Sequence, residues 1–81
     1  MSAREMFEKL GYEIEQDNEV RLVYIKVTQD NGIDDGLIEK VIFEKIHRWI
    51  SATSDGYFIP ISFEELQAIN KQVEELGWNE R

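Results

Sequence analysis

Apolar residues recur at steps of three and four positions near the C-terminal end of the chain, within SFEELQAINKQVEELGW at residues 62–78. The residues that share this stripe of a helix with ~3.6 residues per turn are Leu66, Ile69, Val73 and Leu76. Ser62 and Glu65 have the spacing of a capping box, and Gly77 supplies the left-handed residue that ends a helix. The pattern therefore predicts a C-terminal helix with one buried face.

The N-terminal end predicts a second helix of the same design. Its capping-box residues are Ser2 and Glu5, and its apolar stripe comprises Ala3, Met6, Phe7 and Leu10. This helix ends at Gly11–Tyr12, as the other ends at Gly77–Trp78. We expect each aromatic side chain to fold back onto the last turn of its helix, Tyr12 onto Phe7 and Trp78 onto Val73.

Between the two helices the hydrophobic period changes to two. Residues 12–17 alternate with carboxylates at every second position, which predicts a strand with one solvated face. After a turn at Asp17–Asn18, residues 19–28 (EVRLVYIKVT) carry apolar side chains on both faces, and we predict an interior strand. Residues 29–36 contain two turn dipeptides, Asn31–Gly32 and Asp35–Gly36, and are predicted to form a loop.

Residues 37–53 fit two different patterns. Their apolar positions suit one long helical stripe, whereas Val-Ile-Phe at 41–43 and Trp-Ile-Ser-Ala-Thr at 49–53 favour strands. The two preceding strands alone would also form a sheet too small to support the packing of two helices. We therefore predict strands at 38–44 and 48–53 that turn near 45–47, followed by a turn at 54–56 and a connection at 57–60, in which Pro60 excludes helix.

These elements predict an α+β fold in the order helix-β-β-β-β-helix. The simplest arrangement is a four-stranded antiparallel meander, with the N-terminal and C-terminal helices packed on one face. A chain of 81 residues forms a single small domain, residues 1–81, with one hydrophobic core.

Composition narrows the classes of function. The net charge of −8 disfavours direct binding to nucleic acid or to an anionic membrane. Cysteine is absent, which excludes disulfides and thiolate zinc sites. No apolar run approaches the ~18 residues of a membrane span, and no signal pattern precedes the first helix. We expect a cytoplasmic protein.

The candidate chemistry favours a protein without catalytic activity. His47 is the only histidine, and no motif supplies a nucleophile for it, so we interpret it as a surface residue. Asp30, Asn31, Asp34 and Asp35 do not follow the spacing of a calcium-binding loop. Phosphate-binding loops, metal-ligand pairs and hydrolase motifs are also absent from the sequence. We predict no catalytic residue, no metal and no cofactor.

Four carboxylates alternate along the first predicted strand and the turn after it: Glu13, Glu15, Asp17 and Glu19. On an extended strand they would point the same way about 7 Å apart, close to the phosphate spacing of a nucleic-acid strand. They are therefore candidate protein-binding residues, and an acidic DNA-mimic inhibitor of a basic nucleic-acid-binding protein is one hypothesis. A solvated face that protects a sheet edge from aggregation is the simpler interpretation.

The remaining candidates for recognition are aromatic. The chain has many large aromatic residues for its length, including Trp49, Tyr57, Phe58 and Trp78. Such residues anchor interfaces when they are exposed, but in a domain this small they more often belong to the core. A homodimer through a sheet edge or through the Trp78 end stays open.

The two ends of the chain carry a resemblance to a known group. AREMFEKLGYE at residues 3–13 and ISFEELQAINKQVEELGW at residues 61–78 resemble small, uncharacterised proteins encoded by phages and prophages of Gram-positive bacteria. These motifs cover about a third of the chain and consist of cap and core residues, so the resemblance implies lineage and fold and carries no site residue. It favours a phage or prophage accessory protein that acts as a protein-interaction module in the host cytoplasm, with a host or phage protein as its partner.

Overall fold

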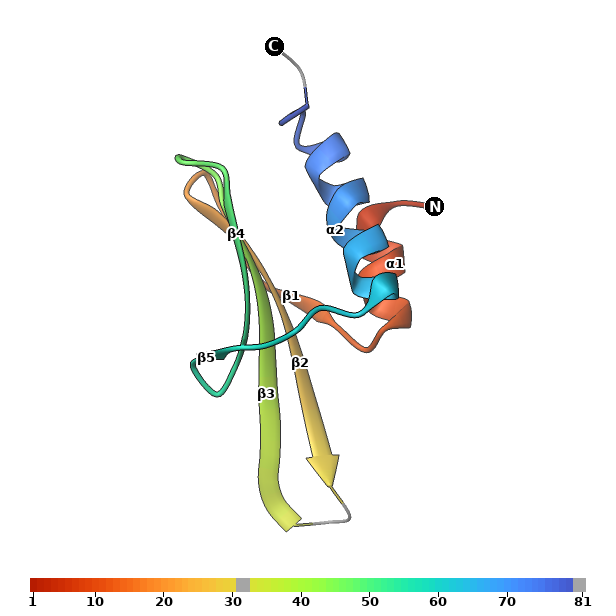
Figure 1. Ribbon diagram of the computed structural model, residues 1–81, viewed down its shortest axis with the longest axis vertical. Helices are drawn as coiled ribbons and strands as arrows, with labels where there is room; N and C mark the ends of the chain where they lie inside the picture. The colour runs from red at the N-terminus through yellow and green to blue at the C-terminus, as the bar shows by residue number, and fades with distance from the viewer. Residues whose placement is uncertain (31–32, 80–81) are drawn as a thin grey trace.

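The computed structural model describes residues 1–30 and 33–79, and Figure 1 shows two helices on the same side of an antiparallel sheet. The elements are α1 (Ala3–Lys9), β1 (Glu13–Asp17), β2 (Arg21–Asp30), β3 (Ile33–Glu44), β4 (Trp49–Ser54), β5 (Tyr57–Phe58) and α2 (Phe63–Glu75). In the described part of the chain the sheet has five strands in the order β1-β2-β3-β4-β5. The α+β class and the flanking helices are confirmed, but the predicted count of four strands is wrong.

The additional strand, β5, forms because the turn before it is a tight hairpin. Asp55 and Gly56 both have positive φ, at 50° and 87°, which is the conformation of a two-residue turn whose twist matches that of paired strands. Ser54 consequently pairs with Tyr57, and Thr53 pairs with Phe58. A strand of two residues carries no periodicity, so the sequence indicates only the turn.

The hairpin of β2 and β3 is longer than predicted. Residues 29 and 30 continue β2, and residues 33–36 begin β3, so the prediction of a loop over 29–36 is wrong; residues 31–32 lie outside the described residues. Val27 pairs with Ile38, and Thr28 pairs with Leu37. The two strands stay paired beyond these residues and extend toward the turn. In Figure 1 this end of the hairpin projects beyond both helices.

The hairpin interpretation of residues 37–53 is confirmed. Val41 pairs with Ala52 and Ile42 with Ser51, so neighbouring apolar residues of β3 lie on opposite faces of the sheet and do not share a helical stripe. The Glu44 carboxylate closes the turn by accepting hydrogen bonds from the backbone N–H groups of Ile46 and His47, at 3.2 and 2.7 Å.

Both helices begin and end as predicted. Ser2 and Ser62 form capping boxes with Glu5 and Glu65. Gly11 and Gly77 have φ of 94° and 74°, in the left-handed region that favours glycine. The backbone N–H of Tyr12 then donates to the carbonyl of Phe7 at 3.0 Å, and that of Trp78 donates to Val73 at 3.1 Å, as expected for Schellman motifs.

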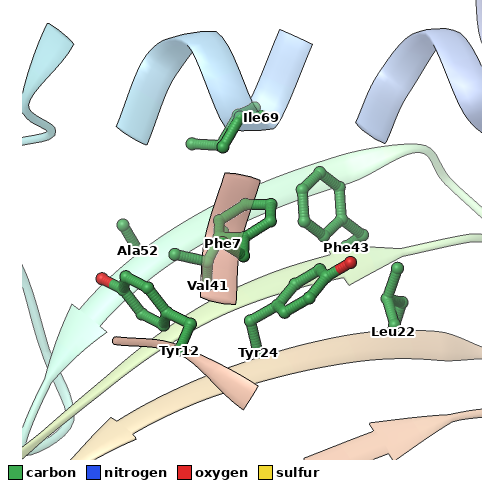
Figure 2. Close-up of a cluster of buried hydrophobic side chains, with 9 residues drawn as sticks. Phe7, Tyr12, Leu22, Tyr24, Val41, Phe43, Ala52 and Ile69 are labelled. Atoms are coloured by element: carbon green, nitrogen blue, oxygen red, sulfur yellow. The ribbon is translucent and has the colours of Figure 1, made fainter. Parts of the chain in front are cut away.

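The core lies between the helices and the face of the sheet that they cover, which we call the inner face (Figure 2). Phe7 of α1 stacks on Tyr24 of β2 with ring centroids 4.0 Å apart, and Phe43 of β3 meets both rings edge-on. The other buried members of the cluster are Tyr12, Leu22, Val41, Ala52, Ala68 and Ile69.

The buried face of α2 differs in part from the predicted stripe. Ile69 is buried, while Val73 and Leu76 are half-buried against the core, but Leu66 is 44% exposed. Ala68 and Gln72 are buried in its place, and the Gln72 side-chain oxygen accepts a 2.6 Å hydrogen bond from the Tyr24 hydroxyl. Alanine and glutamine are not counted when an apolar stripe is identified. The stripe predicted from the sequence is therefore rotated by part of a helical turn from the face that is buried.

Candidate interaction surfaces

The acidic row does not form one surface, because β1 contains an irregularity between Ile14 and Gln16. Glu13 pairs with Ile25, whereas Asp17 pairs with Leu22, three residues away along β2. Antiparallel partners lie on the same face and successive residues of a strand alternate, so Glu13 and Asp17 lie on opposite faces. The expectation that the four carboxylates point the same way is therefore wrong.

Two of these carboxylates have cationic partners within the protein. Lys40 of β3 reaches Glu15 at 3.1 Å, and Lys45 reaches Asp17 at 3.1 Å while also donating to the backbone carbonyl of Asn18 at 2.6 Å. Glu19 lies in the turn between β1 and β2. The ion pairs reduce the negative charge available along β1, and the role of Glu13, Glu15, Asp17 and Glu19 in binding stays a prediction.

His47 has contacts that organise the β3–β4 turn. Its Nδ1 lies 3.1 Å from the Glu44 carboxylate, and its ring stacks on Trp49 with centroids 4.6 Å apart. The backbone N–H of His47 and its ring hydrogen bond hold the pKa of Glu44 below its usual range. These contacts order the turn.

A network of polar side chains closes the core where β1 and β2 meet the start of α2. The Tyr12 hydroxyl donates to the Glu65 carboxylate at 2.8 Å; Lys26 lies 5.0 Å from the centre of the Tyr12 ring and pairs with Glu39 at 3.2 Å. Burial and the Glu65 bond raise the pKa of Tyr12. Burial raises the pKa of Glu65, but the bonds from Tyr12 and Ser62 outweigh it and lower the pKa overall.

This network ties the sheet to α2. Residues 1–30 and 33–79 enclose no pocket, and they contain no group of three histidine or carboxylate side chains placed to hold a metal ion. The rejected calcium-loop candidates, Asp30, Asn31, Asp34 and Asp35, have side chains outside the described part.

Three of the four aromatic residues singled out from the sequence are exposed. Trp78 packs edge-on against Phe43, with ring centroids 6.2 Å apart, so it belongs to the core margin and is not a free anchor for a dimer. Trp49, Tyr57 and Phe58 are 65%, 78% and 83% exposed. The expectation that such residues lie in the core is wrong for these three.

Five exposed large apolar side chains lie between Tyr57 and Leu66, a stretch that we call the 57–66 segment; Tyr57 and Phe58 pair with Ser54 and Thr53 and therefore lie on opposite faces of the sheet. The segment comprises β5, the connection to α2 and the first turn of α2, and it crosses in front of the sheet in Figure 1. Its exposed apolar side chains are Tyr57, Phe58, Ile61, Phe63 and Leu66, at 78%, 83%, 44%, 68% and 44%. Only Tyr57 and Phe58 of this set are candidates from the sequence, because the residues belong to three different elements without a common period.

A second apolar surface is the face of the sheet opposite the core, which we call the outer face. The register places Val23, Ile25 and Val27 of β2 on it, since their neighbours Leu22 and Tyr24 are core residues. The partners of Val23 and Val27 on β3 are Ile42 and Ile38, and Trp49 of β4 lies beside Glu44 on the same face. Neither helix covers this face (Figure 1).

Comparisons of the chain with protein-family models, with curated proteins and with solved structures gave no match. Neither helix in the described part of the chain is long and apolar enough to cross a membrane.

Proposed function

We propose that this protein is a non-enzymatic protein-interaction module, a phage or prophage accessory protein that acts in the host cytoplasm by binding a host or phage protein through the 57–66 segment. The observation that supports this proposal is the exposure of five large apolar side chains within ten consecutive residues. Burying one such side chain is worth roughly 1.5–3 kcal/mol. Several such side chains buried together supply the apolar centre of a protein interface.

The backbone of the 57–66 segment is held in place at both ends, which lowers the entropy cost of binding. The two-residue turn fixes Tyr57 opposite Ser54, and the backbone N–H of Ile59 donates to the carbonyl of Ala52 at 3.2 Å. The Ser62–Glu65 capping box fixes the far end. The exposed rings are therefore displayed on an ordered support.

Charge selects the kind of partner. The chain carries −8, so a partner with a basic rim around an apolar patch would associate faster than a neutral one. The DNA-mimic alternative needs a row of carboxylates along one face. Because Glu13 and Asp17 lie on opposite faces, the protein-interaction module is the function that the geometry supports best.

A capture experiment tests the proposal. The tagged protein is used to recover partners from a Gram-positive host lysate at low and high salt, and each candidate is then purified and titrated against the protein. We expect one partner to bind saturably, and the triple variant Tyr57→Ser/Phe58→Ser/Phe63→Ser to weaken binding at least ~100-fold, since three anchors are lost. Ile46→Ser is the matched control, because Ile46 is 67% exposed in a different turn.

Two results would count against the proposal. One is the lack of any saturable protein partner at either salt concentration. The other is a purified complex that the triple variant and Ile46→Ser weaken equally, which would place the contact elsewhere. Circular dichroism of each variant confirms that the fold is retained.

A further inference from the structure

The outer face is apolar at positions where a solvated sheet face is normally polar. Val27 and Ile38 are direct partners across β2 and β3 and are 55% and 41% exposed, and Trp49 is 65% exposed on the neighbouring strand. Val23 is only 3% exposed although it lies outside the core cluster, so the outer face already shields one of its own apolar side chains. A sheet with apolar residues on both faces is normally covered on both.

We propose that the outer face packs against the outer face of a second copy of this chain, forming a symmetric dimer of two stacked sheets. The contact is isologous, because the same patch is used by both copies. It does not use the face that carries the helices, and of the 57–66 segment it includes only Phe58, whose partner Thr53 pairs with Lys40 of the outer face.

Charge identifies a second copy as the occupant. The register places Glu13, Arg21, Lys40 and Glu44 on the outer face, and Glu15 joins them through its 3.1 Å ion pair with Lys40. Among the side chains of this face that the structure describes, three carboxylates and two cations give a net charge of −1, whereas the whole chain carries −8. A basic partner would be attracted more strongly to other surfaces, while two outer faces can meet with little repulsion.

The area of the outer face suits a dimer of modest affinity. Strands at ~4.8 Å spacing and ~3.3 Å per residue give a face on the order of 600 Å² for a sheet with this central hairpin. Two such faces bury about 1,200 Å² in total, the lower limit for specific interfaces. The ion pair between Glu15 and Lys40 lies on this face, so each of these two charges already has a partner within the same chain.

Sedimentation of the purified protein alone tests the dimer. We expect the mass to rise from the 9.6 kDa of one chain toward twice that value over roughly 1 µM to 1 mM, the range in which an interface of this size dissociates. Ile38→Lys places a charge in the apolar part of each copy's contact and should raise the dissociation constant at least ~10-fold. Leu37→Lys is the matched control: Leu37 is 52% exposed and adjacent in sequence, but it lies on the inner face.

Tryptophan fluorescence gives a second readout. In a Trp78→Phe background the emission of Trp49 should shift to shorter wavelength as the dimer forms, and Ile38→Lys should abolish that shift. Val27→Lys, on the neighbouring strand, repeats the test should Ile38→Lys fail to fold. A monomer throughout the concentration range would overturn the proposal, as would equal weakening of the dimer by Ile38→Lys and Leu37→Lys. Either failure leaves the capture of a different protein by the 57–66 segment unaffected.

Discussion

The two faces of the central sheet are built from the same strands but have different environments. On the inner face Tyr24, Val41 and Phe43 are at most 1% exposed, because two helices cover them. On the outer face Val27, Ile38 and Trp49 are between 41% and 65% exposed, although they are equally apolar. Alternation along a strand assigns side chains to two faces, whereas the position of the helices decides which face becomes the core of the single chain.

The largest effect that separates the two faces is expected from truncating neighbouring residues of β3. Phe43→Ala should lower the free energy of unfolding by about 3–5 kcal/mol, because it removes a ring that packs against Phe7, Tyr24 and Trp78. Ile42→Ala, on the outer face, should cost about 1 kcal/mol in dilute protein. Urea unfolding at low concentration measures both. Equal losses would mean that the outer face contributes to the fold as much as the core does.

A smaller effect is expected at the buried hydrogen bond between sheet and helix. Tyr24→Phe retains the ring stack on Phe7 but leaves the Gln72 side-chain oxygen without its 2.6 Å donor, which should cost about 1–3 kcal/mol. Tyr57→Phe is the control, because that hydroxyl belongs to a side chain that is 78% exposed. The double variant Tyr24→Phe/Gln72→Leu should recover part of the loss in thermal unfolding. No difference between Tyr24→Phe and Tyr57→Phe would contradict this account.

The smallest effect concerns pH. The pKa values of Glu5, Glu44 and Glu65 are lowered in the folded protein, because each carboxylate accepts hydrogen bonds. The unfolded chain therefore binds more protons in acid. The stability from these groups is fully present above their ordinary pKa of about 4.5 and is lost as pH falls through their folded values.

Thermal unfolding across this acidic range measures the effect. Glu65→Gln should flatten the loss of melting temperature with acidification, since it removes the group that joins Tyr12 to α2. Glu64→Gln, one residue earlier on the exposed side of the same helix turn, provides the control. A steeper acid slope in Glu65→Gln than in the parent protein would reverse the assigned sign.

Local signals in the sequence predicted the ends of the helices better than the face that each helix buries. The Ser–Glu and Gly–aromatic pairs involve groups three to five residues apart, so they define the caps without reference to the rest of the chain. Which face of α2 is buried depends on Tyr24, a residue distant in sequence whose hydroxyl selects Gln72. Leu66 was consequently placed in the core and lies at the surface.

The candidate surfaces were less predictable for the same reason. The four carboxylates of the acidic row do alternate along the sequence, but the irregularity in β1 places Glu13 and Asp17 on opposite faces of the sheet. The apolar side chains of the 57–66 segment belong to a strand, a connection and a helix, and their exposure depends on which distant elements pack against them. The exposure of Trp49 likewise follows from the absence of a helix over the outer face (Figure 1).

The helix caps, the central hairpins and the α+β class follow from the amino-acid pattern, because short-range hydrogen bonds and side-chain periods specify each of them. The fifth strand, the length of the β2–β3 hairpin, the buried face of α2 and the exposed apolar surfaces arise from the folding of the whole chain. These features depend on pairing register and on contacts between distant segments. A pattern read along the chain does not contain that information.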